Sequence, residues 1–363
     1  GRFLRPYGLQ FLLLLALALS AQPLVNASRT DIDKFLGTQS SKTVTDDTGE
    51  KQDLFTYKSD YAGTGELLNA IEDLGERMSE EGTVLLKNNG ALPLSAGEKG
   101  KVSLLGFSSY YPVRGGFANQ GTDADTVDLV QALTAKGFTL NPDLQPLYQG
   151  LESVFTTEVQ SWGGTITYTT ITAPSIGGVF SSKEPSQAAL NGANASWKDG
   201  LSNYNVMIVT IARAGSENGT YLPGEAGVDP SQNLNQTDPL GLSDDERDLI
   251  QAAIDAKGAD GKVIVLLNSS SAMEVQELED NAGVDAILQI GLPGGYGFYG
   301  VADVLSGDAN PSGHLADTYA ADIASSPAAQ NFGNLEWTNP DPSISLNSAI
   351  VQAEGIYMGY KYY

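Results

Sequence analysis

The sequence predicts an α/β fold, with a mostly parallel sheet between two layers of helices. Three observations lead to this prediction. Short apolar runs bounded by turn residues are typical of strands that are buried on both faces. Helical patterns alternate with these runs through connections of a few residues, as in repeated βα units. A chain of 363 residues with 41% hydrophobic residues is also long and apolar enough to bury a full core.

The expected strands are the apolar runs. In chain order they are 101–106 (KVSLLG), 205–212, 262–267 and 284–290, with an alternating stretch at 165–170 as a further candidate. The expected helices repeat apolar residues every three or four positions. In chain order they are 67–78, 127–136, 243–257, 272–279 and 296–305. Gly137, Gly258 and Gly307 follow three of these helices as stop signals, and Ser243 with Glu246 forms a capping box.

The loop after the expected strand 205–212 is the segment that points most directly to chemistry. It is rich in glycine and carries two glutamates, Glu217 and Glu225. Open α/β sheets bind their ligands just beyond the carboxyl ends of parallel strands, which is where this loop begins. Glycines on each side of a carboxylate let the backbone turn tightly and approach a substrate closely. The pattern alone is compatible with a catalytic carboxylate or with a solvated loop side chain.

Composition excludes several classes of function. The formal net charge of −24 repels nucleic acid and anionic membrane surfaces, so we expect no nucleic-acid partner. The absence of cysteine excludes disulfides, thiolate metal sites and thiol catalysis. His314 is the only histidine and is expected to be a turn or packing residue, so no multi-histidine metal site is possible. We therefore expect no metal and no cofactor.

The N-terminus predicts export. Arg2 and Arg5 precede the apolar stretch 11–19, which small and polar residues follow, as in a signal peptide or a single membrane anchor. Both alternatives remain open for residues 1–26. Residues 27–57 are polar and predict a spacer, and 58–363 form the expected folded domain. Either alternative predicts that the folded domain is extracellular or at the cell surface.

A resemblance to a known family rests on five segments that occur in this order. They are EEGTVLLKNNGALPL (80–94), KVSLLG (101–106), PVRGGFANQG (112–121), GLPGGYGFYGVADVLSGDANPSGHLADTY (291–319) and AEGIYMGYKYY (353–363). From about residue 51 to the end, the chain resembles the six-stranded α/β sandwich domain of glycoside hydrolase family 3. The resemblance implies an exo-acting retaining β-glycosidase, most often a β-glucosidase, that hydrolyses β-linked glucosides. The family carries its nucleophilic aspartate on a TIM-like barrel and its acid/base glutamate on the sandwich.

The order of the segments is similar to the subgroup in which the sandwich precedes the barrel. This likeness implies a barrel downstream of Tyr363, with the C-terminal tyrosines packed against it, and an isolated chain without useful activity. The alternative is a non-catalytic carbohydrate-binding or scaffold module with the same fold. A nucleotide-binding domain is disfavoured, because the glycine-rich stretch 112–121 lacks the Lys-Ser/Thr ending of a phosphate loop.

The resemblance also implies site residues. Glu217 keeps the family's spacing from the strand in Arg213-Ala-Gly-Ser-Glu217-Asn-Gly, so it is the favoured acid/base. Glu225 keeps the Gly-Glu dipeptide of the family motif but lies eight residues later, and it is the alternative acid/base. Arg114 and Asn119 are the expected sugar contacts. Independently of the resemblance, five Asn-x-Ser/Thr sequons could be glycosylated in a eukaryotic host, at Asn26, Asn194, Asn218, Asn235 and Asn268.

Overall fold

The computed structural model describes residues 60–115, 126–161, 164–168, 184–214, 228–229, 234–235, 238–331, 335–336, 348–349 and 352–363. The chain divides into two units, 1–60 and 61–363, and every element described below belongs to the second. The expected signal or anchor segment at 1–26 and the expected spacer at 27–57 lie outside the described residues. None of the described helices is long and apolar enough to cross a bilayer.

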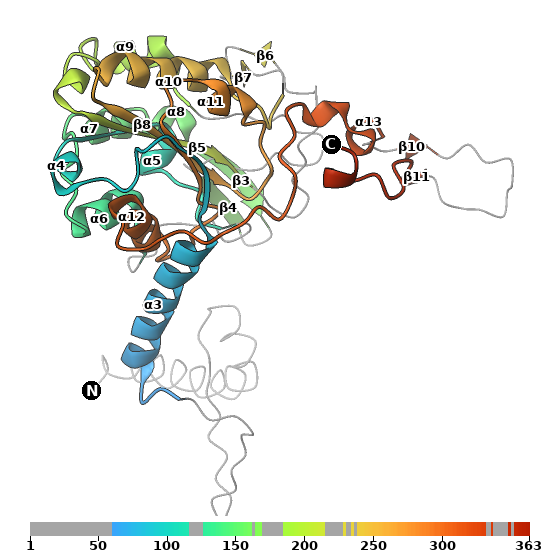
Figure 1. The fold of residues 1–363 in the computed structure, drawn as a ribbon, viewed down its shortest axis with the longest axis horizontal. Coiled ribbons are helices and arrows are strands. Elements are labelled where there is room, and N and C mark those ends of the chain that lie inside the picture. The colour runs from blue at the N-terminus through green and yellow to red at the C-terminus, as the bar shows by residue number, and fades with distance from the viewer. Residues whose placement is uncertain are drawn as a thin grey trace, which may run out of the picture. The chain divides into compact units, whose positions relative to one another are not determined.

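A five-stranded sheet with helices on both faces forms the centre of the described chain (Figure 1). The strands, in spatial order, are β1 (Val84–Asn88), β9 (Ala286–Gln289), β8 (Lys262–Ser269), β5 (Val206–Arg213) and β2 (Val102–Leu105). Three of the four pairings are parallel, and the edge strand β1 runs antiparallel to β9. The predicted α/β class and mostly parallel sheet are therefore confirmed.

The expectation of a six-stranded sheet is wrong for the described residues, which contribute five strands. The further candidate strand forms as β4 (Gly164–Tyr168), but it pairs with β3 (Thr157–Ser161) in a separate antiparallel hairpin. Its sequence explains why. GTITY alternates small or polar residues with apolar ones, which suits a ribbon with one buried face, whereas a strand covered by helices on both faces needs a continuous apolar run.

The core consists of two layers, one on each face of the sheet. Successive side chains of β5 point in opposite directions, as in any strand. Met207 and Val209 join the cluster that includes residues of α7 (Leu144–Gly150), α9 (Gln187–Ala193) and α10 (Asp244–Ala256). Ile208 joins the opposite cluster, with residues of α6 (Leu129–Ala135) and α12 (Phe298–Ser306). Burial on both faces is the reason that most residues of this strand are apolar.

The helices begin and end where local sequence signals indicate. Asp128 caps α6 and Ser243 caps α10, each in a capping box, which confirms the predicted box at Ser243. Gly307 follows α12 in the left-handed conformation with φ 82°, which favours glycine. The expected helix 272–279 is shorter in the structure, as α11 (Gln276–Asp280). Its predicted first turn is not helical, because the Glu274 backbone N–H donates instead to the Leu240 carbonyl.

The most N-terminal of the described helices, α3 (Thr64–Gly82), confirms the prediction for 67–78 and projects from the layer of α6 and α12 (Figure 1). The remaining described elements are short. They are α4 (Ala96–Lys99), α5 (Phe107–Tyr110), α8 (Glu152–Phe155), α13 (Pro327–Gln330), β6 (Val228–Asp229), β7 (Leu234–Asn235), β10 (Leu335–Glu336), β11 (Ser348–Ala349) and three 3₁₀ turns at Leu201–Asn203, Ile323–Ser325 and Gly359–Lys361.

Candidate functional site

The carboxyl ends of the parallel strands gather polar side chains at one edge of the sheet. β5 ends at Arg213, β8 ends at Asn268 and Ser269, and β9 ends at Gln289. All four residues are buried. Ligands of open α/β sheets bind outside this edge, so the loops that leave it form the candidate site.

Arg213 holds the base of the loop that contains the two candidate glutamates. Its side chain is completely buried and forms a two-pronged ion pair with Glu246, at 2.7 and 2.9 Å. It also donates to the backbone carbonyls of Pro239 at 2.6 Å and Gly241 at 2.5 Å. A guanidinium has five N–H donors in a fixed fork, so one side chain can bind all these groups. Arg213 thus ties the end of β5 to the chain that returns at 239–246.

Asn268 connects the end of β8 to the loops on either side. Its amide accepts from the Val113 N–H at 2.7 Å and donates to the Val113 carbonyl at 2.8 Å. It also donates to the Gly291 carbonyl at 2.7 Å, beyond the end of β9. The side chain is completely buried and both amide hydrogens are used. The sequon at Asn268 is therefore closed to glycosylation in the folded protein.

Arg114 lies at the same edge, on the segment that follows β2 and α5. Its backbone carbonyl accepts from the Gly294 N–H at 2.7 Å. Its guanidinium donates to the Val127 carbonyl and lies 5.8 Å from the centre of the Phe298 ring. Burial lowers the pKa of this side chain, and the nearby charge of Asp128 acts in the opposite direction. The structure thus places Arg114 at the edge, in contact with the start of α12.

A buried carboxyl group, Glu184, lies where β2 turns into α5. It accepts from the Phe107 N–H at 2.9 Å, and the neighbouring Gly106 N–H donates to the Tyr148 hydroxyl at 2.9 Å. Burial raises the pKa of Glu184 well above its usual range, and the charges of Glu246 and Asp245 add to the effect. Gly106 has φ 96°, and a Cβ there would lie 2.6 Å from the Thr210 carbonyl, so this turn requires glycine.

The sequence prediction and the structure overlap only in part. Glu217, Glu225 and Asn119 lie outside the described residues, which stop at Gly115 and Ala214 before those loops. His314 is exposed in an irregular segment. The structure adds residues that sequence reasoning missed: Arg213 with Glu246, Asn268, Glu184 and Gln289. Their functional contacts join residues far apart in the chain, so the capping box at Glu246 and the sequon at Asn268 did not indicate them. The arginine at the end of an apolar strand was the signal that could have pointed to a buried ion pair.

Comparison with known proteins gives a consistent result. The domain described as the Glycosyl hydrolase family 3 C-terminal domain matches residues 83–360. A β-glucosidase of Ruminococcus albus is 24% identical over 300 residues, 81% of this chain and 26% of that protein. Probable β-glucosidase A of Aspergillus clavatus is 26% identical over 310 residues, 82% of this chain and 30% of that protein. The chain therefore spans less than a third of the length of these relatives.

Solved structures show the same likeness. β-Glucosidase 3B from Thermotoga neapolitana in complex with glucose superposes with a TM-score of 0.59 at 26% identity, over 82% of this chain and 36% of that one. A β-glucosidase from Paenibacillus barengoltzii superposes with a TM-score of 0.58 at 25% identity, over 80% of this chain and 27% of that one.

Proposed function

The chain belongs to glycoside hydrolase family 3, and from this premise we propose that it is the sandwich-domain portion of an exo-acting retaining β-glycosidase, with β-glucosidase as the specific activity. The observation that carries the proposal is the match of the family's C-terminal domain over 83–360, together with the β-glucosidases among its relatives. The substrates that follow from it are β-linked glucosides.

We propose Glu217 as the general acid/base, with Glu225 as the alternative. Retaining glycosidases use two carboxyl groups about 5 Å apart, and one of them must keep its proton near neutral pH. Glu217 follows the last residue of β5 by four positions, at the ligand-binding edge of the sheet. The buried Arg213–Glu246 pair at the base of this loop supports the assignment, because an acid/base must be presented from a rigid support. Arg114 and Asn119 are the proposed sugar contacts.

The nucleophile is proposed to come from a TIM-like barrel domain that follows the sandwich. The relatives are more than three times as long as the part that this chain matches. The C-terminal residues form an exposed apolar cluster, in which Tyr357 is 60% and Tyr360 is 78% exposed. An exposed cluster of this kind is typical of a surface that a partner covers. We propose that the barrel covers it.

The isolated 363-residue chain is expected to show no useful β-glucosidase activity, because one of its two carboxyl groups would be supplied by the barrel. The measurement is hydrolysis of an aryl β-glucoside by the purified chain, beside the product of the complete gene. Turnover by the longer protein alone agrees with the proposal. If the isolated chain hydrolyses the glucoside and this activity persists after repurification, the proposal is contradicted. If the complete gene encodes no barrel and its protein is inactive, a non-catalytic module is favoured.

The folded domain is expected outside the cytoplasm, because Arg2, Arg5 and the apolar stretch 11–19 resemble an export signal. The spacer at 27–57 would have a root-mean-square span of ~30 Å, enough to separate the domain from the bilayer. Fractionation of cells that express the intact gene measures this. Recovery in the soluble cytoplasm with residues 1–25 intact would show that the location is wrong.

A further inference from the structure

Helix α3 is held against α12 by unusually close packing over its C-terminal half. A Cβ on Gly300 of α12 would overlap the Glu76 carbonyl and lie 2.8 Å from the Glu80 nitrogen. The two backbones therefore approach without a side chain between them. The opposite face of α3 carries an exposed apolar stripe, with Met78 65% exposed. The contact with α12 is thus the main attachment of α3 to the described domain.

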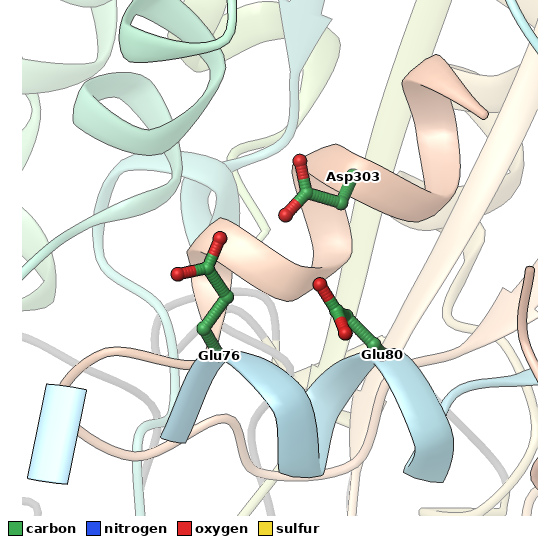
Figure 2. Close-up of side chains that lie close together, drawn as sticks. All are labelled: Glu76, Glu80 and Asp303. Carbon is green, nitrogen blue, oxygen red and sulfur yellow. The ribbon is translucent and has the colours of Figure 1, made fainter. Parts of the chain in front are cut away.

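Carboxyl groups from both helices meet at this contact. Figure 2 shows Glu76 and Glu80, one turn apart on α3, and Asp303 on the facing surface of α12. Each offers a carboxylate oxygen within 4.8 Å of the other two. The Asp303 side chain is only 5% exposed. Like charges at these distances repel strongly where water is partly excluded.

A single ammonium group lies among them. Lys136, just beyond the end of α6, places its Nζ 2.8 Å from a Glu76 oxygen and 2.7 Å from an Asp303 oxygen. The Tyr299 ring centre lies 6.0 Å from the same nitrogen. Lys136 already pairs with two of the three carboxyl groups, so we assign no metal to this cluster. One positive charge does not balance three ionised carboxyl groups.

The pKa values of Asp303 and Glu76 indicate which of the carboxyl groups takes up a proton. Burial and the interaction with Glu76 together raise the pKa of Asp303 to about 6, against the opposing effect of Lys136. Burial also opposes ionisation of Glu76, but hydrogen bonds from Lys136 and Asp303 together lower its pKa. The raised pKa of Asp303 and the lowered pKa of Glu76 favour a proton on Asp303 rather than on Glu76 below about pH 6.

We propose that Glu76, Asp303 and Lys136 form a proton-dependent latch, which holds α3 against α12 while the two carboxyl groups share a proton and loosens when both are ionised. The groups that face Asp303 are Glu76 and Glu80 from α3, Lys136 from the end of α6, and Tyr299 from its own helix. The latch is independent of the proposed glycosidase activity, because it lies on α3 and α12 rather than at the carboxyl edge of the sheet.

The direction of the pH effect follows from linkage. The pKa of Asp303 is raised in the folded protein from 3.8 to about 6, so its contribution to the attachment is complete below about pH 4 and is lost as the pH rises through 6. The lowered pKa of Glu76 acts in the opposite direction, because its contribution is lost as the pH falls below its usual value of 4.5. A shift of about two units changes the equilibrium between attached and detached α3 by up to ~100-fold. Most of this change falls between about pH 4 and pH 6, so about 10-fold of it remains between pH 5 and pH 8.

Because the chain contains no cysteine, a single introduced thiol is the only site that a thiol-specific alkylating reagent can modify, and its alkylation rate reports the exposure of α3. In a Ser79→Cys variant the thiol lies in the buried contact with α12, and in a Met78→Cys variant it lies on the exposed face of the same helix. The ratio of their alkylation rates removes the intrinsic pH dependence of the thiol. We expect the Ser79→Cys rate, relative to Met78→Cys, to rise by up to ~10-fold from pH 5 to pH 8.

Two further substitutions identify the cause. Asp303→Asn keeps the shape and a donor to Glu76 but cannot ionise, so the relative rate should stay low and flat with pH. Asp73→Asn removes a charge from the exposed surface of α3 and should leave the rise unchanged. If Ser79→Cys disturbs the packing, hydrogen exchange of the α3 amides can be measured instead in chains without an introduced cysteine. The parent, Asp303→Asn and Asp73→Asn proteins are then compared in the same way. A flat profile in the parent, or an equal rise with Asp303→Asn, would overturn the proposal.

Discussion

Glu217→Ala in the enzyme completed by the barrel is expected to slow hydrolysis of an unactivated β-glucoside by about 10²–10⁴-fold, the usual contribution of general acid–base catalysis. Substrates with good leaving groups should lose less in the first step, because they need little help from a proton. Azide should restore part of the turnover by replacing the base-activated water. Steady-state kinetics on a paired set of aryl and alkyl glucosides measures all three effects.

Glu225→Ala is the matched control for this experiment. It removes the same carboxyl group from the same loop, eight residues later. We expect a small loss with no dependence on the leaving group and no rescue by azide. If Glu225→Ala shows the acid/base pattern and Glu217→Ala does not, the assignment between the two is wrong, while the proposed activity stands.

Glu246→Ala is expected to lower the free energy of unfolding by about 3–5 kcal/mol. The substitution leaves the completely buried Arg213 guanidinium without its counter-charge, and an uncompensated buried charge is costly. It also removes the acceptor that closes the capping box of α10 at the Ser243 N–H. Urea denaturation of the full chain, followed by circular dichroism, measures the change.

A neighbouring ion pair supplies the control. Arg247 pairs with Glu277 at 2.9 Å, but the two side chains are 46% and 43% exposed. Glu277→Ala should therefore change the free energy of unfolding by only ~0–1 kcal/mol. The double variant Arg213→Met with Glu246→Leu should recover only part of the stability lost in Glu246→Ala, since it removes the unpaired charge but leaves the Pro239 and Gly241 carbonyls without their donor. Equal losses from Glu246→Ala and Glu277→Ala would show that burial does not determine the contribution of this pair.

Four of the five strands of the sheet, and the helices α3, α6, α10 and α12, were predictable because each carries its own local pattern. The runs that became β2, β5, β8 and β9 are apolar over most of their length, and α10 and α12 have caps or stop signals within a few residues of their ends. Such signals are local, so one sequence is enough to read them. The direction of β1 was not predictable. Its antiparallel pairing with β9 depends on residues about 200 positions away, and a short apolar run contains no information about its partner.

The sequence by itself determined the α/β class, the likeness to the family and a glycine-rich glutamate loop after a buried strand, because residue type and spacing carry these features. Only the tertiary structure decided how that loop is anchored and where charges meet. Arg213 forms an ion pair with Glu246, 33 positions away in the chain, and Asn268 forms a hydrogen bond with Val113, 155 positions away. Glu76 meets Asp303 only because Gly300 lets α3 and α12 approach closely. Interactions of this kind depend on burial and distance, which the folded chain creates and which no local pattern records.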